Sequence, residues 1–163
     1  MTSARWLGSV LLGLLACVGS GAMAQGRFDF DTTPGHLSKR VVPSRYALRL
    51  DLDPARDSFS GSATVTLRLR SEQAAIELHA FEMTAGAAHL RSGRQTRALT
   101  VTPLPESQTW RLTPADGQPI AAGDHRIDIA YSGKVNVSGE GLFVAPHDAG
   151  GTPQRMLATQ LEA

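Results

Sequence analysis

Apolar and polar residues alternate in two neighbouring stretches of the chain, and this alternation predicts two β-strands. The apolar positions are Tyr46, Leu48, Leu50 and Leu52 in the first stretch, and Ala63, Val65, Leu67 and Leu69 in the second. A period of two places one face of each strand in the core and the other in water. Pro54 and Gly61 lie between the stretches and favour turns. We therefore predict a β-hairpin whose apolar face is covered by further strands, because an isolated hairpin is marginally stable.

Shorter alternating stretches follow at intervals of about ten residues, and Gly, Pro and Asp residues separate them. They are residues 75–80, 83–90, 99–102, 109–113, 125–131, 142–144 and 155–163. Trp110 and Leu112 are predicted to share a buried face, and His125 lies on the apolar face of its strand. No stretch shows a convincing helical period. This pattern is typical of an all-β sandwich of mostly antiparallel short strands.

The first 24 residues have the features of a secretory signal peptide. Arg5 precedes an apolar run over residues 6–18, and Ala22-Met23-Ala24 supplies small residues at a cleavage site. The run is shorter than the ~20 apolar residues that a membrane span needs. We predict cleavage after Ala24 and export to the periplasm or the medium, with a lipoprotein anchored through Cys17 as the alternative. Residues 25–41 have no hydrophobic period and are predicted to form a mobile leader before a domain at residues 42–163.

Charge and cysteine content exclude several classes of function. Sixteen Lys and Arg residues against fifteen Asp and Glu residues give a net charge of +1, without the basic stripe that nucleic acid binding requires. Cys17 is the sole cysteine, so cleavage leaves no disulfide and no thiolate ligand for zinc. The mature domain must be held together by its core, which is feasible because a ~150-residue domain buries roughly 70% of its unfolded surface.

The motifs of common hydrolases are absent from the sequence, and the chain end is the most informative stretch. No two histidines have the spacing of the helical zinc motif H-E-x-x-H, and His125 is predicted to be a satisfied core or edge histidine. In a final strand, Gln160 and Glu162 point to the same face. They form either an ordinary solvated strand face or a site where a carboxylate beside an amide binds a cation such as an amine.

Several short segments, taken in order, resemble the N-terminal β-domain of the M1-family zinc aminopeptidases. They are V-P-S-R-Y-A-L-R-L-D-L-D at 42–53, F-S-G-S-A-T-V-T-L at 59–67, I-E-L-H-A at 76–80, I-x-I-x-Y-x-G at 127–133, G-L-F at 141–143 and M-L-A-T-Q-L-E-A at 156–163. The resemblance covers nearly all of the mature chain. It implies a saddle-like β-domain that packs on a thermolysin-like catalytic domain.

The resemblance also implies where the chemistry resides. The family's zinc ligands, catalytic glutamate and G-A-M-E-N loop lie in the second domain, so this chain is expected to hold no catalytic residue or metal and to be inactive alone. Zinc is expected in the missing catalytic domain. By the family pattern, Gln160 and Glu162 line the substrate entrance, and Glu162 holds the free α-amine of a peptide. The expected partners are peptide N-termini and the chain's own catalytic domain. The alternative is a free-standing exported β-sandwich with a binding or structural role.

Overall fold

The computed structural model describes residues 28–160, and the regular structure of this part is almost entirely antiparallel β. The strands are β1 (Val41–Asp51), β2 (Ser58–Leu69), β3 (Ile76–His79), β4 (Met83–Ser92), β5 (Gln95–Leu104), β6 (Thr109–Pro114), β7 (Gly123–Lys134), β8 (Gly141–Asp148) and β9 (Pro153–Gln160). A single 3-10 turn, η1 (Pro105–Ser107), connects β5 to β6. The prediction of an all-β domain is confirmed.

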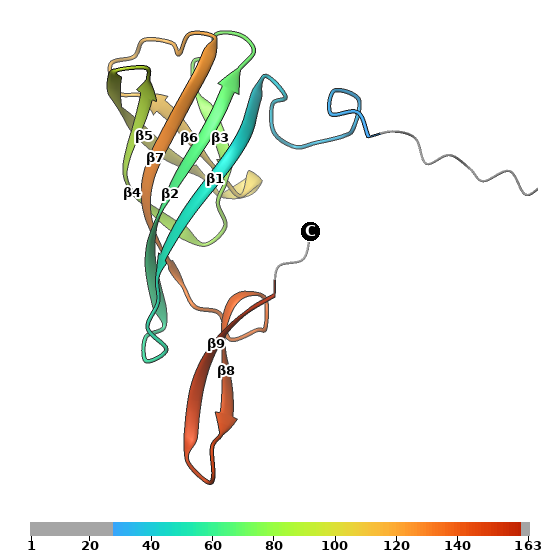
Figure 1. Cartoon of the computed structure of the whole chain (residues 1–163), viewed down its shortest axis with the longest axis vertical. Helices are drawn as coiled ribbons and strands as arrows, with labels where there is room; N and C mark the ends of the chain where they lie inside the picture. Colours follow the sequence, from blue (N-terminus) through green and yellow to red (C-terminus); the bar gives the residue numbers. More distant parts are fainter. Residues whose placement is uncertain (1–27, 161–163) are drawn as a thin grey trace, which may run out of the picture.

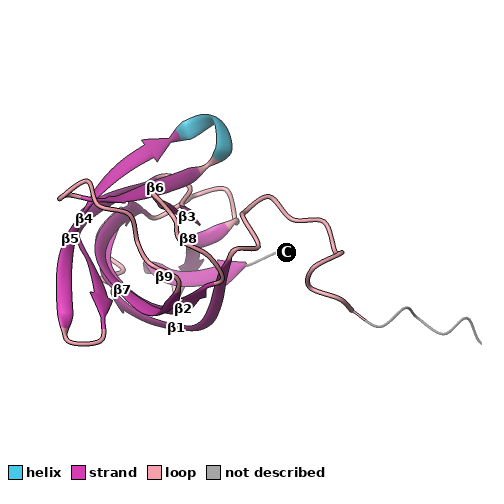
Figure 2. Ribbon diagram, turned by 90° about the horizontal axis from the view of Figure 1, so that it is seen from above, coloured by secondary structure: helices cyan, strands magenta, loops and turns pink. Residues whose placement is uncertain are grey.

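Seven of these strands form one curled sheet in the order β1-β2-β7-β4-β5-β6-β3. The curl brings the two edge strands, β1 and β3, toward the same open side of the sheet (Figure 2). Strands β8 and β9 pair only with each other among the described strands, and their hairpin extends from one end of the curled sheet (Figure 1). The hairpin therefore stands apart from the main core.

The core fills the inside of the curl, where alternate residues of neighbouring strands stack across the sheet. Val65 on β2 lies opposite Ile127 on β7, which in turn lies opposite Leu90 on β4, and all three are buried. Complete burial of such side chains contributes about 1.5–3 kcal/mol each. Trp110 and Leu112 on β6 are also buried, as their alternation predicts. This part of the sheet is the main source of stability.

His125 is buried on the core face of β7, and both of its ring nitrogens have partners. Nε2 lies 2.9 Å from the carbonyl oxygen of Ala121, and because a carbonyl only accepts, Nε2 donates that hydrogen bond. Nδ1 lies 2.7 Å from the Ser92 hydroxyl. The prediction of a satisfied core histidine is confirmed.

The prediction that the apolar row of β1 is buried is wrong. The hairpin itself forms as predicted, with Tyr46 opposite Val65 and Leu48 opposite Ala63, so the row lies on the core face of the sheet. However, Tyr46, Leu48 and Leu50 remain 55%, 64% and 45% exposed, and Leu52 beyond the strand end is exposed as well. β1 is an edge strand with a neighbour on one side only. A period of two identifies the face of a strand, but it does not show that another element covers that face.

Two glycines make room for aromatic rings at the hairpin end of the sheet. A Cβ atom on Gly133 would lie 2.6 Å from the ring of Phe59, and one on Gly61 would lie 3.0 Å from the ring of Tyr131. The two rings pack edge to face, with their centroids 6.3 Å apart. Each ring therefore occupies the space that a side chain on the neighbouring strand would take.

Side chains of the segment before β1, among them Phe30 and Asp31, contact Arg70, which directly follows β2. The Phe30 ring centroid lies 5.7 Å from Nζ of Lys39 and 5.3 Å from the guanidinium carbon of Arg70. Asp31 Oδ1 accepts a hydrogen bond from Arg70 at 2.5 Å. These contacts do not test the predicted mobility of residues 25–41.

The predicted signal peptide, with Ala22, Ala24 and the alternative lipid site Cys17, lies outside the described residues. Its cleavage therefore stays a prediction. Between residues 28 and 160, no helix has the length and apolar character needed to cross a bilayer.

Candidate functional site

The one predicted site residue that the structure describes is Gln160, the last residue of β9. It is exposed and lies opposite Gly141 on β8. Because side chains alternate along a strand, Gln160 shares its face with Ala158 and Met156. Gly141 has a positive φ of 63°, and a Cβ atom on it would lie 3.9 Å from Nδ2 of Asn136. Glu162 lies outside the described residues, and its place beside Gln160 stays a prediction.

The connection from β7 into the hairpin fixes where β8 begins. The N–H of Asn136 donates to the carbonyl of Leu142 at 2.8 Å, and the carbonyl of Asn136 accepts from the N–H of Val144 at 2.9 Å. The Asn136 side-chain amide donates to the carbonyl of Glu140 at 3.1 Å. Val135, just before it, is buried. The connection is thus a compact hydrogen-bonded turn that holds the root of the hairpin.

A single residue of the β1–β2 loop contacts both the hairpin and its root. The carbonyl of Asp57 accepts a hydrogen bond from the N–H of Val135 at 3.0 Å. The Asp57 carboxylate accepts a second bond, from Nη2 of Arg155 on β9, at 2.5 Å. Arg155 and Asp57 are 39% and 84% exposed, so their ion pair contributes little to global stability. Its effect is geometric, because it fixes β9 relative to the sheet.

The carboxylates on the outer face of the sheet are engaged with arginine or hydroxyl groups. Asp128 accepts a hydrogen bond from the Thr64 hydroxyl at 2.7 Å and one from Arg126 at 3.1 Å. Arg91 Nε lies 2.7 Å from the other oxygen of Asp128, as an ion pair without hydrogen-bond alignment. Burial on its own raises the pKa of Asp128, but Thr64 and the two arginines outweigh it and hold the pKa below its usual value. Asp128 is therefore a structural anion rather than a general base.

Arg97 and Asp116 form a second such pair on the turn after β6. Arg97 Nε lies 2.9 Å from Asp116, and Arg97 Nη2 and Nη1 donate hydrogen bonds to the carbonyl oxygens of Gln118 and Pro119, respectively. The hydrogen bond from Arg97, followed by the one from the N–H of Gln118, lowers the pKa of Asp116. This pair fastens the turn to β5.

No three metal-ligating side chains gather within residues 28–160. His36 and His79 approach each other edge to face, with ring centroids 6.5 Å apart, but they have no third donor in this part of the chain. A catalytic zinc site requires three protein ligands and an open position. The described stretch does not supply that donor set, so no chemical step can be assigned to a metal held by it.

Two hollows lie elsewhere on the described surface. One, of about 820 Å³, is lined by polar residues that include Asp51, Ser60 and Ser132. The other, of about 580 Å³, lies between the segment before β1 and the inner face of the sheet, and it is lined largely by apolar residues such as Phe28 and Leu67. Gln160 lines neither of these two hollows.

The sequence pattern of the Peptidase M1 N-terminal domain matches residues 42–163 of this chain. The chain therefore belongs to the M1 peptidase family and contains its N-terminal domain. It is also similar to a protein named Aminopeptidase N from Acetobacter pasteurianus, with 28% identity over 141 residues. That alignment covers 85% of this chain but only 38% of the relative, so the chain spans well under half of the relative's length. The family resemblance predicted from the sequence is confirmed.

Sequence reasoning found the family but missed the contact that positions the hairpin. Asp57 and Arg155 are 98 residues apart, and neither belongs to a motif or a periodic pattern that would link them. The roles predicted for Gln160 and Glu162 are not tested by the geometry or by the comparisons.

Proposed function

We propose that this chain is the N-terminal, substrate-anchoring domain of an exported zinc aminopeptidase that removes residues from the N-termini of peptides. The family match over residues 42–163 carries the proposal. It is supported by the relative named Aminopeptidase N, most of whose length lies outside the aligned region. The catalytic domain, with the zinc that activates water or the scissile carbonyl, would be a separate part of the same polypeptide.

In this proposal the described domain contributes binding and orientation. Continuing β9 by two residues beyond Gln160 places Glu162 on the same strand face. A carboxylate there accepts charge-assisted hydrogen bonds from a protonated α-amine, and the Gln160 amide lies next to it at the first subsite. Anchoring the amine fixes the distance between the peptide's first bond and the catalytic centre.

The nucleotide sequence downstream of codon 163 tests the proposal directly. We expect the reading frame to continue into a second domain that contains G-x-M-E-N-like and H-E-x-x-H motifs. A stop codon at that position would contradict the proposal and favour a free-standing β-domain. Export has its own test, since mass spectrometry of the exported protein should find Gln25 as the first residue, whereas a lipid on Cys17 would place the protein on a membrane.

A further inference from the structure

Ser92 and His125 form a hydrogen-bonded pair of side chains at one end of the curled sheet. Ser92 is the last residue of β4, and His125 lies near the start of β7. Arg91 lies opposite Arg126 in these two strands, so the next step of the register places Ser92 opposite His125. The serine hydroxyl and Nδ1 of the histidine are 2.7 Å apart. β7 runs from this end of the sheet toward the β8–β9 hairpin, which extends from the opposite end (Figure 1).

The second ring nitrogen of His125 fixes the direction of this hydrogen bond. Nε2 lies 2.9 Å from the carbonyl oxygen of Ala121 and donates to it. In the neutral imidazole, Nδ1 is then unprotonated and can only accept, so the Ser92 hydroxyl donates its proton toward Nδ1. A hydroxyl that is hydrogen-bonded to a base, while a third group orients that base, is the arrangement of an activated nucleophile.

The two members of the pair differ in their exposure to solvent. His125 is only 7% exposed, and Leu67, which lies opposite it on β2, is buried. Ser92 is half-buried at the rim of the core. The next residue, Gly93, has a φ of 59°, and a Cβ atom on it would have no neighbour within 4 Å. The base is therefore shielded from water, whereas the turn beside the serine is open.

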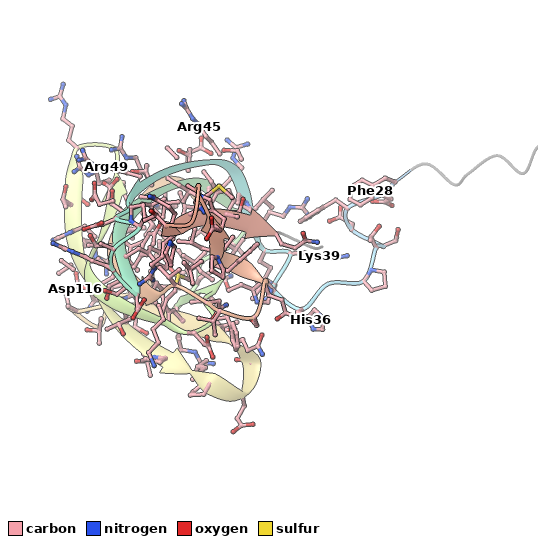
Figure 3. The ribbon with its side chains drawn as sticks, turned by 90° about the horizontal axis from the view of Figure 1, so that it is seen from below. Phe28, His36, Lys39, Arg45, Arg49 and Asp116 are labelled. Atoms are coloured by element: carbon pink, nitrogen blue, oxygen red, sulfur yellow. The ribbon has the colours of Figure 1, made fainter. Side chains whose placement is uncertain are left out.

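The segment before β1 does not cover this end of the sheet. The turn that follows Ser92 leads into β5, whose Arg97 is hydrogen-bonded to Asp116. Figure 3 shows Asp116 on the side of the molecule opposite to Phe28, which belongs to the segment before β1. That segment therefore lies away from the turn beside Ser92.

We propose that Ser92 is an acyl-acceptor site, at which His125 acts as the general base for attack on an activated carboxylic ester. Oγ of Ser92 forms a bond to the carbonyl carbon while its proton moves to Nδ1 of His125. The bond from that carbon to the leaving oxygen then breaks, and the leaving alcohol takes the proton from His125. The products are an acyl ester of Ser92 and a free alcohol.

The chemistry of the pair restricts the class of substrate. An activated ester has a leaving group that departs with little assistance, so a nucleophile and a base suffice for the transfer. The acyl group stays on the serine, which makes Ser92 a modification site. The proposal does not rest on any aminopeptidase activity, and its readout is the mass of the peptide that contains residue 92.

The first test treats the full-length protein with 4-nitrophenyl acetate and measures the acetylation of individual serines by peptide mass spectrometry. We expect Ser92 to be acetylated at least about 100-fold faster than Ser107, since a positioned general base typically contributes a factor of this size or more. Ser107 is the matched control, because it is exposed and its hydroxyl contacts the Thr109 hydroxyl at 2.8 Å instead of an imidazole. His125→Gln should remove the difference. If Ser92 reacts no faster than Ser107, the hydrogen bond only fastens the turn to β7, and the proposal is overturned.

A second test keeps the buried histidine and so does not depend on His125→Gln folding well. In Ser92→Cys, an imidazole within hydrogen-bond reach should favour the reactive thiolate. We expect iodoacetamide to alkylate residue 92 of this variant about tenfold faster at neutral pH than residue 107 of Ser107→Cys, with both rates read from the masses of the corresponding peptides. Equal alkylation rates at the two positions would show that His125 does not activate its neighbour and would contradict the proposal.

Discussion

Asp57 Oδ1 lies 2.5 Å from Nη2 of Arg155 and connects the β1–β2 loop to β9 across 98 positions of the chain. The backbone carbonyl of Asp57 also holds Val135 at the root of the same hairpin. The loop of the first hairpin thus positions the last one, whose end carries Gln160. The position of the candidate substrate-anchoring strand therefore depends on a residue far from it in sequence.

Replacing Asp57 with alanine should loosen the hairpin while leaving the core intact. The ion pair is exposed, so we expect the free energy of unfolding to fall by less than about 1 kcal/mol. Amide hydrogen exchange in β8 and β9 should nevertheless become faster, because the hairpin can then open locally without first breaking the contact between Arg155 and residue 57. Asp53→Ala is the matched control, since Asp53 pairs with Arg56 within the same loop. Equal exchange in β9 for the wild type and Asp57→Ala would show that the contact does not position the hairpin.

Asp128 should make the stability of the domain depend on pH. Its pKa is lowered in the folded state, so the unfolded chain takes up the proton first as the pH falls. The stabilisation from Asp128 is therefore fully present above its unfolded pKa of about 3.9 and is lost as the pH falls through the lower folded pKa.

The matching variant is Asp128→Asn. We expect it to lower the free energy of unfolding at neutral pH by about 1 kcal/mol. In urea unfolding measured at a series of pH values, the loss of stability at acid pH should be smaller than in the wild type. Asp124→Asn serves as a control, because Asp124 forms a solvent-exposed pair with Arg68. If Asp128→Asn loses as much stability at acid pH as the wild type does, Asp128 is not the source of this pH dependence.

Gly133→Ala should destabilise the domain because its new methyl group meets the ring of Phe59. A methyl group on residue 133 would lie 2.6 Å from the ring carbons of Phe59, so the ring or the strand must move. Such overpacking typically costs about 1–3 kcal/mol. Chemical denaturation should show this loss, whereas Gly35→Ala, where a Cβ atom has no neighbour within 4 Å, should not. A Phe59→Leu background should reduce the penalty, and an undiminished penalty would locate the strain elsewhere.

Much of the fold follows from the sequence because a period of two directly reports the two faces of a strand. The pattern identified the core face of β2 and β7, where Val65 and Ile127 are buried. The pattern failed for Leu48. It placed this side chain on the correct face of β1, but no described element covers that face. Burial depends on which element covers the face of a strand. The alternation of residues within one strand does not reveal its place in the sheet or what covers it.

The candidate site was predictable only in part. The terminal strand and the face of Gln160 follow from alternation, and the family follows from an ordered set of short segments. The contact between Asp57 and Arg155 could not be predicted. The sequence contains many acidic and basic residues far apart in the chain, and nothing in it shows which of them come together. The orientation of the hairpin is a tertiary property that only the structure provides.

Steady-state kinetics of the proposed full-length aminopeptidase on an aminoacyl anilide tests the proposed role of Glu162 most directly. Charge-assisted hydrogen bonds contribute about 1.5–3 kcal/mol, so Glu162→Ala should lower kcat/KM roughly 10- to 100-fold. Gln160→Ala should cost less, because a neutral amide binds the substrate more weakly, and Glu106→Ala on the exposed turn η1 should cost nothing. Zinc content and folding should stay unchanged in all three variants. A kcat/KM for Glu162→Ala equal to that of the wild type would contradict the assignment of this strand end as the anchor of the substrate amine.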